Sequence, residues 1–127
     1  MSVCWSSTAE NTIVAKTVIL MQDNMSKNTL NRIEFINTDR ARVVQIALMP
    51  NEVSPKHFHS KIVERVVCLC GSIDIHEDGY GTKSTTLTPG QMHEIPPKSV
   101  HYLVNTQKTV SEYLLIQSGL YDFIEVH

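Results

Sequence analysis

The stretch PKHFHSKIVERVVCLCG, residues 55–71, decides the fold class of this chain. Two histidines, His57 and His59, lie two residues apart among β-forming residues, and Glu64 follows. Side chains alternate between the two faces of a strand, so His57 and His59 project to the same side. The residues between His59 and Glu64 can turn the chain, and a neighbouring strand would bring Glu64 level with both imidazoles. Two nitrogens and one carboxylate oxygen indicate part of a transition-metal site.

Short apolar runs separated by turn residues fill the rest of the chain. Residues 41–49 (ARVVQIALM) are typical of a strand that ends at Pro50. Residues 76–83 (HEDGYGTK) are typical of a hairpin tip, and residues 12–21 are predicted to form a further strand. Many short strands at regular spacing predict an all-β fold, a sandwich or a jelly-roll barrel, with residues 1–127 in a single domain.

The composition excludes several classes of partner. The chain has 127 residues, 42% hydrophobic and 19% charged, with a net charge of −2. No basic run is long enough to follow a phosphate backbone, which argues against nucleic acid. The longest apolar runs are about eight residues, too short to span a membrane. The first residues, MSVCWSSTAEN, lack the pattern of a secretory signal, so we expect a cytoplasmic protein that binds a small-molecule substrate.

A second segment, GQMHEIPPKSVHYLVN at residues 90–105, supplies a fourth candidate ligand. Pro96 and Pro97 predict a stiff turn, and His101 begins the strand that follows it. His101 shares its predicted face with Asn105. The sequence therefore offers three histidines and one glutamate from two separate parts of the chain.

Together the two segments resemble the two motifs of the cupin superfamily. The first motif ends in H-x-H, three or four residues, E, six residues and G, which residues 51–71 match. The second is G, five residues, P-x-G, two residues, H, three residues and N, which residues 90–105 match except at one glycine. Asn51 and Lys98 stand where the motifs usually have glycine. Asparagine tolerates the left-handed backbone conformation better than most residues.

The resemblance implies a double-stranded β-helix, a jelly-roll barrel, that holds one divalent metal ion in its interior. It implies the ligands His57, His59, Glu64 and His101, with two coordination positions left for water, substrate or dioxygen. Three nitrogens and one oxygen suit Fe, Mn, Ni, Co or Zn, whereas Mg and Ca prefer oxygen ligands alone. The alternative is structural, because some cupins have lost the metal and strand-edge histidines can be plain surface residues.

Three further residues are candidates for the site. Cys68 shares a predicted face with Glu64 and is expected to line the pocket, although a small buried core residue is the simpler interpretation of both Cys68 and Cys70. Gln45 is a second candidate for the pocket wall. His93 is the candidate general base near the metal, and a partly exposed strand histidine is the alternative.

A fold of this kind does not select one reaction, so three functions are considered. The first is an enzyme that uses the metal as a Lewis acid on a small sugar-like molecule or a keto or hydroxy acid, in isomerase, epimerase or lyase chemistry. The segment LIQSGLYD at residues 115–122 favours it, because it resembles the end of the cupin part of phosphomannose-isomerase-type enzymes. The alternatives are an Fe(II)-dependent dioxygenase and a non-catalytic cupin that binds a metal or ligand.

We also expect a homodimer. Single-domain cupins commonly pair, and exposed strand edges favour pairing. Phe58, Val67 and Leu69 are predicted to point outward and suit a dimer face. Residues 1–11 are interpreted either as a mobile tail or as a strand that docks on a partner subunit.

Overall fold

The computed structural model of this protein describes residues 31–79 and 81–127. These residues form ten β-strands in two five-stranded sheets, which confirms the predicted all-β fold. The described residues contain no helix, and therefore none that is long and apolar enough to cross a membrane. The predicted strand at residues 12–21 and the predicted tail at residues 1–11 lie outside the described residues.

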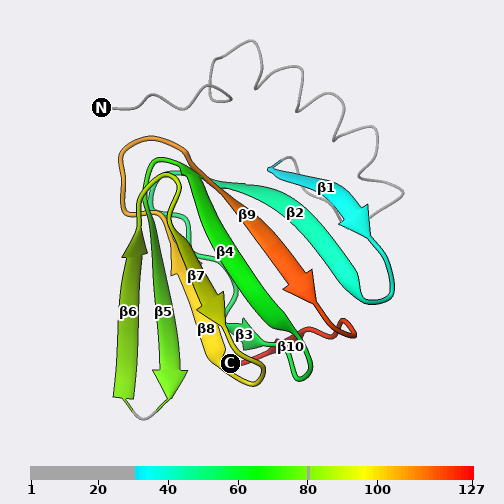
Figure 1. Cartoon of the computed structure of the whole chain (residues 1–127). Coiled ribbons are helices and arrows are strands. Elements are labelled where there is room, and N and C mark those ends of the chain that lie inside the picture. Colours follow the sequence, from blue (N-terminus) through cyan, green and yellow to red (C-terminus); the bar gives the residue numbers. More distant parts are fainter. Residues whose placement is uncertain (1–30, 80) are drawn as a thin grey trace.

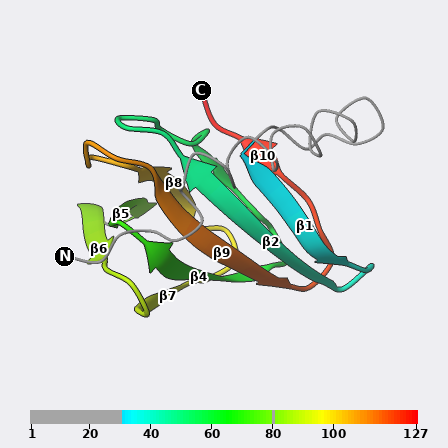
Figure 2. The same ribbon diagram turned by 90° about the horizontal axis from the view of Figure 1, so that it is seen from above.

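The two sheets face each other as two layers, and all their strand pairs are antiparallel (Figures 1 and 2). The first sheet has the order β1 (Arg32–Asn37), β2 (Ala41–Leu48), β9 (Ser111–Ser118), β4 (Val63–Cys70) and β7 (Met92–Ile95). The second has the order β10 (Ile124–Glu125), β3 (His57–Phe58), β8 (Val100–Val104), β5 (Ile73–Gly79) and β6 (Gly81–Leu87). Strands β5 and β6 form the hairpin predicted at residues 76–83.

The hydrophobic core lies between the sheets. Strand β4 shows the alternation that builds it, since Glu64, Val66, Cys68 and Cys70 are buried and the residues between them are more exposed. Cys68 is a free thiol in this core, and burial raises its pKa. The buried core cluster consists of Leu48, Val66, Cys68, Ile73, Ile75, Leu87, Ile95, Leu103 and Tyr113.

Two non-glycine residues of residues 31–79 and 81–127 adopt a left-handed backbone, and both stand at the motif positions where glycine is usual. Asn51 has a φ of 64° and Lys98 a φ of 70°. The backbone N–H of Asn51 donates to the carbonyl of Asn105 at 2.7 Å, and that of Lys98 donates to the carbonyl of His59 at 2.7 Å. The turn that contains Lys98 therefore holds the chain beside a candidate ligand.

Asn105 connects the ends of several strands. It is fully buried, and its Nδ2 donates to the carbonyls of Leu48 and Thr109, each at 2.9 Å. Its Oδ1 accepts from the backbone N–H of Gln107 at 2.9 Å and from the hydroxyl of Ser111 at 3.0 Å. A buried amide with partners for both its donors and its acceptor fixes the local structure. Asn105 thus ties β2 and β9 of the first sheet to the end of β8 in the second.

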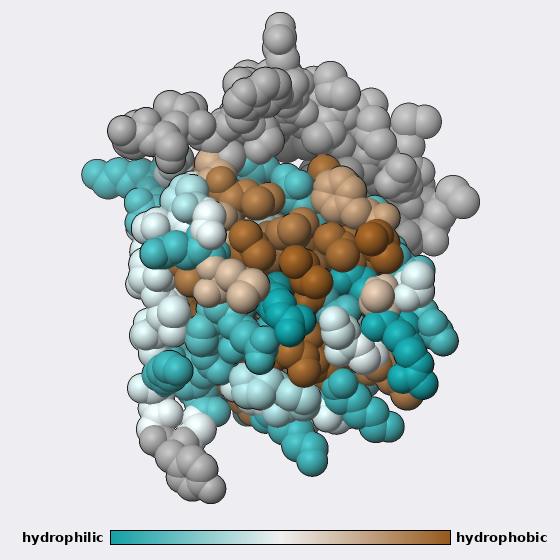
Figure 3. All heavy atoms as spheres, in the orientation of Figure 1, coloured by the Kyte–Doolittle hydropathy of each residue, from teal (hydrophilic) through white to brown (hydrophobic). Residues whose placement is uncertain are grey.

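The outer face of the first sheet is largely apolar. Figure 3 shows hydrophobic side chains gathered over the middle of the face that this sheet turns to the viewer. Phe58 belongs to the second sheet, so it cannot share one face with Val67 and Leu69. The strand pairing places these apolar residues on the outer face: Ile33, Ile36, Val43, Val67, Leu69, Met92, Leu114 and Ile116.

Replacing Lys98 by glycine should stabilise the fold, because glycine reaches a positive φ without the steric cost of a Cβ. We expect Lys98→Gly to raise the free energy of unfolding by about 0.5–1 kcal/mol in urea denaturation. Lys98→Ala keeps a Cβ in the same conformation and is the matched control, with little change expected. A loss of stability in the glycine variant would show that strain at this turn is not the dominant effect.

Candidate metal centre

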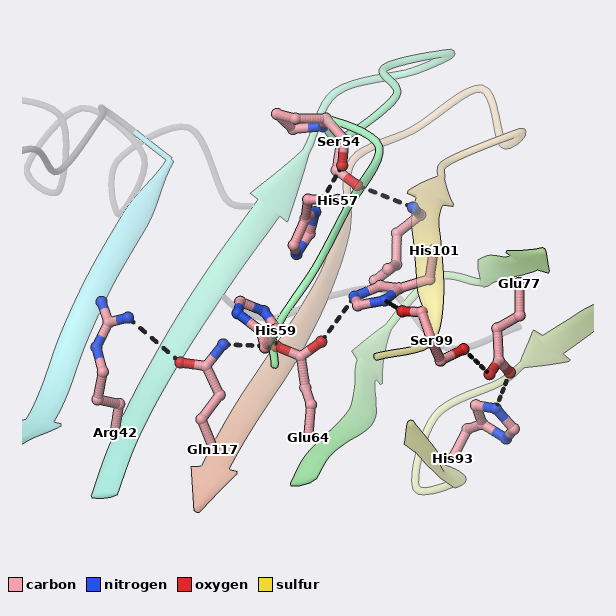
Figure 4. Close-up of polar contacts among 12 residues, drawn as sticks. Arg42, Ser54, His57, His59, Glu64, Glu77, His93, Ser99, His101 and Gln117 are labelled. Carbon is pink, nitrogen blue, oxygen red and sulfur yellow. Dashed lines mark hydrogen bonds and ion pairs between the residues drawn. The ribbon is translucent and has the colours of Figure 1, made fainter. Parts of the chain in front are cut away.

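His57, His59, Glu64 and His101 meet in the space between the two sheets (Figure 4). Their ligand atoms all lie within 4.8 Å of one another, and all four residues are buried. His57 is paired with His101 across β3 and β8, so both imidazoles lie on the same face of the second sheet. Glu64 reaches the cluster from β4 in the opposite sheet.

Each histidine of this cluster donates its Nδ1–H to a backbone carbonyl. The acceptors are the carbonyls of Pro55 for His57 (2.7 Å), Ser99 for His101 (2.8 Å) and Asp122 for His59. A carbonyl oxygen can only accept, so each Nδ1 carries the proton and each Nε2 keeps its lone pair. This is the arrangement that orients histidines as metal ligands.

Two of the three Nε2 atoms have no hydrogen-bond partner. Those of His59 and His101 are buried and unpaired. They lie 3.6 Å from Glu64 Oε2 and 2.9 Å from Glu64 Oε1 respectively, without the geometry of a hydrogen bond. Burying an unpaired polar nitrogen costs free energy, which a metal ion bound to the lone pair would remove. The residues present therefore fit a metal ion.

The electrostatics agree with that fit. Burial raises the pKa of Glu64, but the neighbouring His101 and His59 lower it by more, so the carboxylate is ionised. Burial lowers the pKa of His57 to about 4, which leaves this imidazole neutral at pH 7. Burial also lowers the pKa of His59, while contacts with Glu64 and Asp122 raise it by more.

The chain after β9 covers one side of the cluster. Residues 119–125, here called the C-terminal strap, cross from the first sheet to β3 in the second (Figure 1). The Phe123 ring stacks on His57 with a centroid distance of 4.3 Å and an interplanar angle of 20°. The Asp122 carboxylate accepts hydrogen bonds from the backbone N–H (2.8 Å) and the hydroxyl of Ser60. Through Phe123, the strap thus contacts the candidate ligand His57.

A cavity of about 310 Å³ opens beside the four residues of the cluster. Its wall combines apolar and aromatic side chains with charged and polar groups. That combination is typical of a pocket that binds and orients a small molecule. Besides the cluster, the lining residues include Ile46, Leu48, Leu103, Tyr113, Leu115, Tyr121, Phe123, Arg32, Arg42, Glu52, Ser54 and Gln117.

Gln45 and Cys68 are not among the residues that line this cavity. Val44 and Leu48 take inward positions on β2, so Gln45 faces outward, where its Nε2 donates to Glu112 Oε1 at 3.2 Å. Cys68 does face inward, but it lies beyond the cavity in the hydrophobic core. The simpler interpretation of Cys68, a small core residue, matches this position.

His93 lies apart from the cluster (Figure 4). Its Nε2 is 2.5 Å from Glu77 Oε1, and Glu77 Oε2 accepts the hydroxyl hydrogen of Ser99 at 3.0 Å. It is not among the residues that line the cavity. The structure therefore separates His93 from the space where a substrate would bind, because its ring turns toward Glu77 rather than toward Glu64.

Several residues of the cavity were not predicted from the sequence. Gln117 on β9 donates from Nε2 to Glu64 Oε2 at 2.6 Å, and its Oε1 accepts from Arg42 Nη1 at 3.4 Å. Glu52, in the turn after β2, is the other carboxylate in the cavity wall. The sequence signal for Arg42 is that it lies two residues before Val44 and therefore on the same inward face of the strand. A charged residue at a strand end is, however, usually solvated.

Comparison with known proteins gives the same fold and two kinds of relative. The family model described as a cupin domain matches residues 44–117. The D-lyxose ketol-isomerase of Cohnella laeviribosi is 25% identical over 103 residues, covering 62% of this chain and 57% of that protein. Germin-like protein subfamily 1 member 7 of Arabidopsis thaliana is 26% identical over 102 residues, covering 76% of this chain and 44% of that protein. The chain thus spans about half the length of these curated relatives.

Solved structures show the same architecture. A protein with a double-stranded β-helix domain from Klebsiella pneumoniae superimposes with a TM-score of 0.67 at 20% identity, covering 76% of this chain and 83% of that chain. An oxalate oxidase superimposes with a TM-score of 0.67 at 18% identity, covering 80% and 58%. At these identities the likeness establishes the fold alone, which is the predicted double-stranded β-helix.

Removing one histidine of the cluster should remove the metal. We expect His101→Ala, purified without a histidine tag and incubated with Mn, Fe, Co, Ni or Zn, to bind metal at least about tenfold more weakly than the unaltered chain. Metal content by mass spectrometry and affinity by calorimetry measure this. His76→Ala is the control, because His76 stacks on Tyr102 outside the cluster. Equal metal content in both variants would contradict the assignment of His101.

Proposed function

The chain belongs to the cupin family, and from that premise we propose that it is an enzyme whose cavity binds a small polar substrate beside one divalent transition metal. The substrate class is a sugar-like molecule or a keto or hydroxy acid, and the reaction is of the isomerase, epimerase or lyase type. The observation that carries the proposal is the cluster of His57, His59, Glu64 and His101 with two unpaired Nε2 atoms at the wall of a cavity.

The four residues of the cluster would hold the metal through three nitrogens and one oxygen. A divalent ion bound there would act as a Lewis acid on an oxygen of the substrate. Fe, Mn, Ni, Co and Zn all accept such a ligand set. The apolar wall, which includes Ile46 and Leu115, would exclude water from the substrate carbons.

Isomerisation next to a carbonyl also needs a group that moves a proton. Glu52 is proposed for this role, because it is the one carboxylate that the described cavity wall offers besides Glu64. It would remove a proton from the carbon next to the substrate carbonyl and return it to the carbonyl carbon, while the hydroxyl proton passes to the former carbonyl oxygen, so that no atom is gained or lost. His93, considered for the role from the sequence, lies outside the cavity.

Isomerase chemistry is preferred to oxygen chemistry on the evidence of similarity. The relative named as a D-lyxose ketol-isomerase is 25% identical in an alignment that covers 62% of this chain. The oxalate oxidase is similar at 18% identity, which bears on the fold alone. Polar groups in the cavity wall, such as Arg42 and Ser54, suit a substrate with several hydroxyl groups.

A homodimer is proposed to form through the outer face of the first sheet. Ile33, Ile36, Leu69 and Met92 on this face are exposed, by 37%, 48%, 42% and 55%. A contiguous apolar face of this kind is typical of a protein–protein interface. The proposed partner is a second copy of the chain.

Replacing Glu52 by glutamine should lower the activity without changing metal binding. In a screen of aldoses, ketoses and hydroxy acids with the metal-loaded protein, we expect turnover that needs metal and persists without dioxygen. Glu52→Gln should lower kcat by about a hundredfold or more while its metal content stays unchanged. Glu94→Gln is the control, because Glu94 pairs with Arg65 away from the cavity.

Other outcomes of the same screen would contradict the proposal. Turnover only with Fe(II) and with uptake of dioxygen would assign a dioxygenase. Metal-loaded protein that binds ligands without turnover would assign a binding cupin. Full activity in Glu52→Gln would exclude this carboxylate as the base.

The dimer proposal has a direct test in solution. Light scattering should give about twice the chain mass of 14.3 kDa. Leu69→Lys should shift the protein toward the monomer, because a charge would be buried in the interface. Ile124→Lys is the control, an exposed apolar residue on the second sheet. A monomer for the unaltered chain would overturn the proposal.

A further inference from the structure

The two oxygens of Glu64 have different partners. Oε1 lies 2.9 Å from His101 Nε2, whereas Oε2 lies 3.6 Å from His59 Nε2. Oε2 accepts a hydrogen bond of 2.6 Å from Gln117 Nε2. Both Glu64 and Gln117 are buried, with exposures of 2% and 5%, so water does not compete for this contact. A charge-assisted hydrogen bond of this length is a strong one.

Arg42 fixes which way the amide of Gln117 points. A guanidinium can only donate, so the oxygen of the amide faces Arg42 Nη1, and its NH₂ group must face Glu64. Arg42 is itself held from two sides. Its Nη2 donates to Glu34 Oε2 at 3.2 Å, and its guanidinium lies 3.9 Å over the ring centroid of Tyr121 in the C-terminal strap.

The sheet places these side chains in one row. Arg42 is the direct pairing partner of Gln117 across β2 and β9, and Gln117 is the direct partner of Glu64 across β9 and β4. Directly paired residues of antiparallel strands share a face, so all three side chains lie on the inner face of the first sheet (Figure 4). The direction of every hydrogen bond in the row is fixed, from Arg42 to Gln117 to Glu64.

We propose that Gln117, oriented by Arg42, is a positioning residue that reserves Glu64 Oε2, so that Glu64 offers a metal ion its Oε1 alone. This inference rests on the proposed metal site and identifies Gln117 as the residue that controls how Glu64 would bind the metal. A carboxylate that binds through both oxygens occupies two coordination positions, as Ca²⁺ sites commonly use it. Gln117 therefore keeps one position open beside the three histidines, where a substrate oxygen can bind.

Cobalt(II) added to the purified chain tests this role, because the visible absorption bands of Co(II) depend on the number and arrangement of its ligands. We expect Gln117→Leu to free Oε2, so that the visible absorption bands of bound Co(II) shift. The affinity for Co(II) should also fall by about tenfold or more, because the carboxylate is no longer held in place. A purely structural role would change stability without changing the Co(II) spectrum.

Gln45→Leu is the matched control. It makes the same substitution on the neighbouring strand, on the opposite face, where Gln45 contacts Glu112. Its Co(II) spectrum and affinity should equal those of the unaltered chain. If Gln117→Leu does not fold, Arg42→Met carries the test, with a smaller change expected in the same direction, since the amide is then no longer oriented.

Failure of this inference and failure of the proposed function would give different results. If the unaltered chain binds Co(II) and both Gln117→Leu and Arg42→Met give the same spectrum and affinity, the positioning role is overturned and the metal site stands. If the unaltered chain binds no Co(II), nor Mn, Fe, Ni or Zn, the proposed function fails and this inference fails with it.

Discussion

Three imidazoles turned inward by their own backbone contacts are the constraint on which the site depends. Each Nδ1–H of His57, His59 and His101 is donated to a carbonyl, so each Nε2 keeps its lone pair, and the ligand atoms of these residues and Glu64 lie within 4.8 Å of one another. A barrel interior that leaves such nitrogens unpaired is costly unless a cation occupies the space between them. The rest of the structure is arranged to hold these four groups at a single point.

Residues far apart in the sequence hold that arrangement. Lys98 adopts a strained backbone and binds the carbonyl of His59, while Asn105 ties both sheets together behind His101. The C-terminal strap adds a third support, since Phe123 stacks on His57. Ligands that come from both sheets and are braced at their ends have little freedom to move. The site is therefore preformed in the fold, as a metal with demanding geometry requires.

The sequence could predict features that are local, such as strand alternation and motif spacing. It could not predict contacts that depend on how the strands pair. Many short apolar runs at regular spacing were sufficient for the all-β fold, and the resemblance of residues 51–71 and 90–105 to the two cupin motifs implied the four candidate ligands. They were not sufficient for Gln45, because parity within a strand does not say which face turns inward. Gln117 could not be found either, since its contact with Glu64 depends on how β9 pairs with β4. The position of His93 could not be predicted for a similar reason: an inward strand position places a side chain between the sheets without saying which neighbour it meets.

The fold alone does not select one reaction, since the proteins that resemble this chain include a ketol-isomerase and an oxalate oxidase. Groups around the candidate metal centre are therefore expected to select it. In this chain those groups are Gln117 on Glu64, Glu52 in the cavity wall, and the strap residues that contact Arg42 and His57. They come from β9, from the turn after β2 and from the chain beyond β9, three segments that can vary without disturbing either histidine motif. That separation lets one barrel keep its metal while its reaction changes.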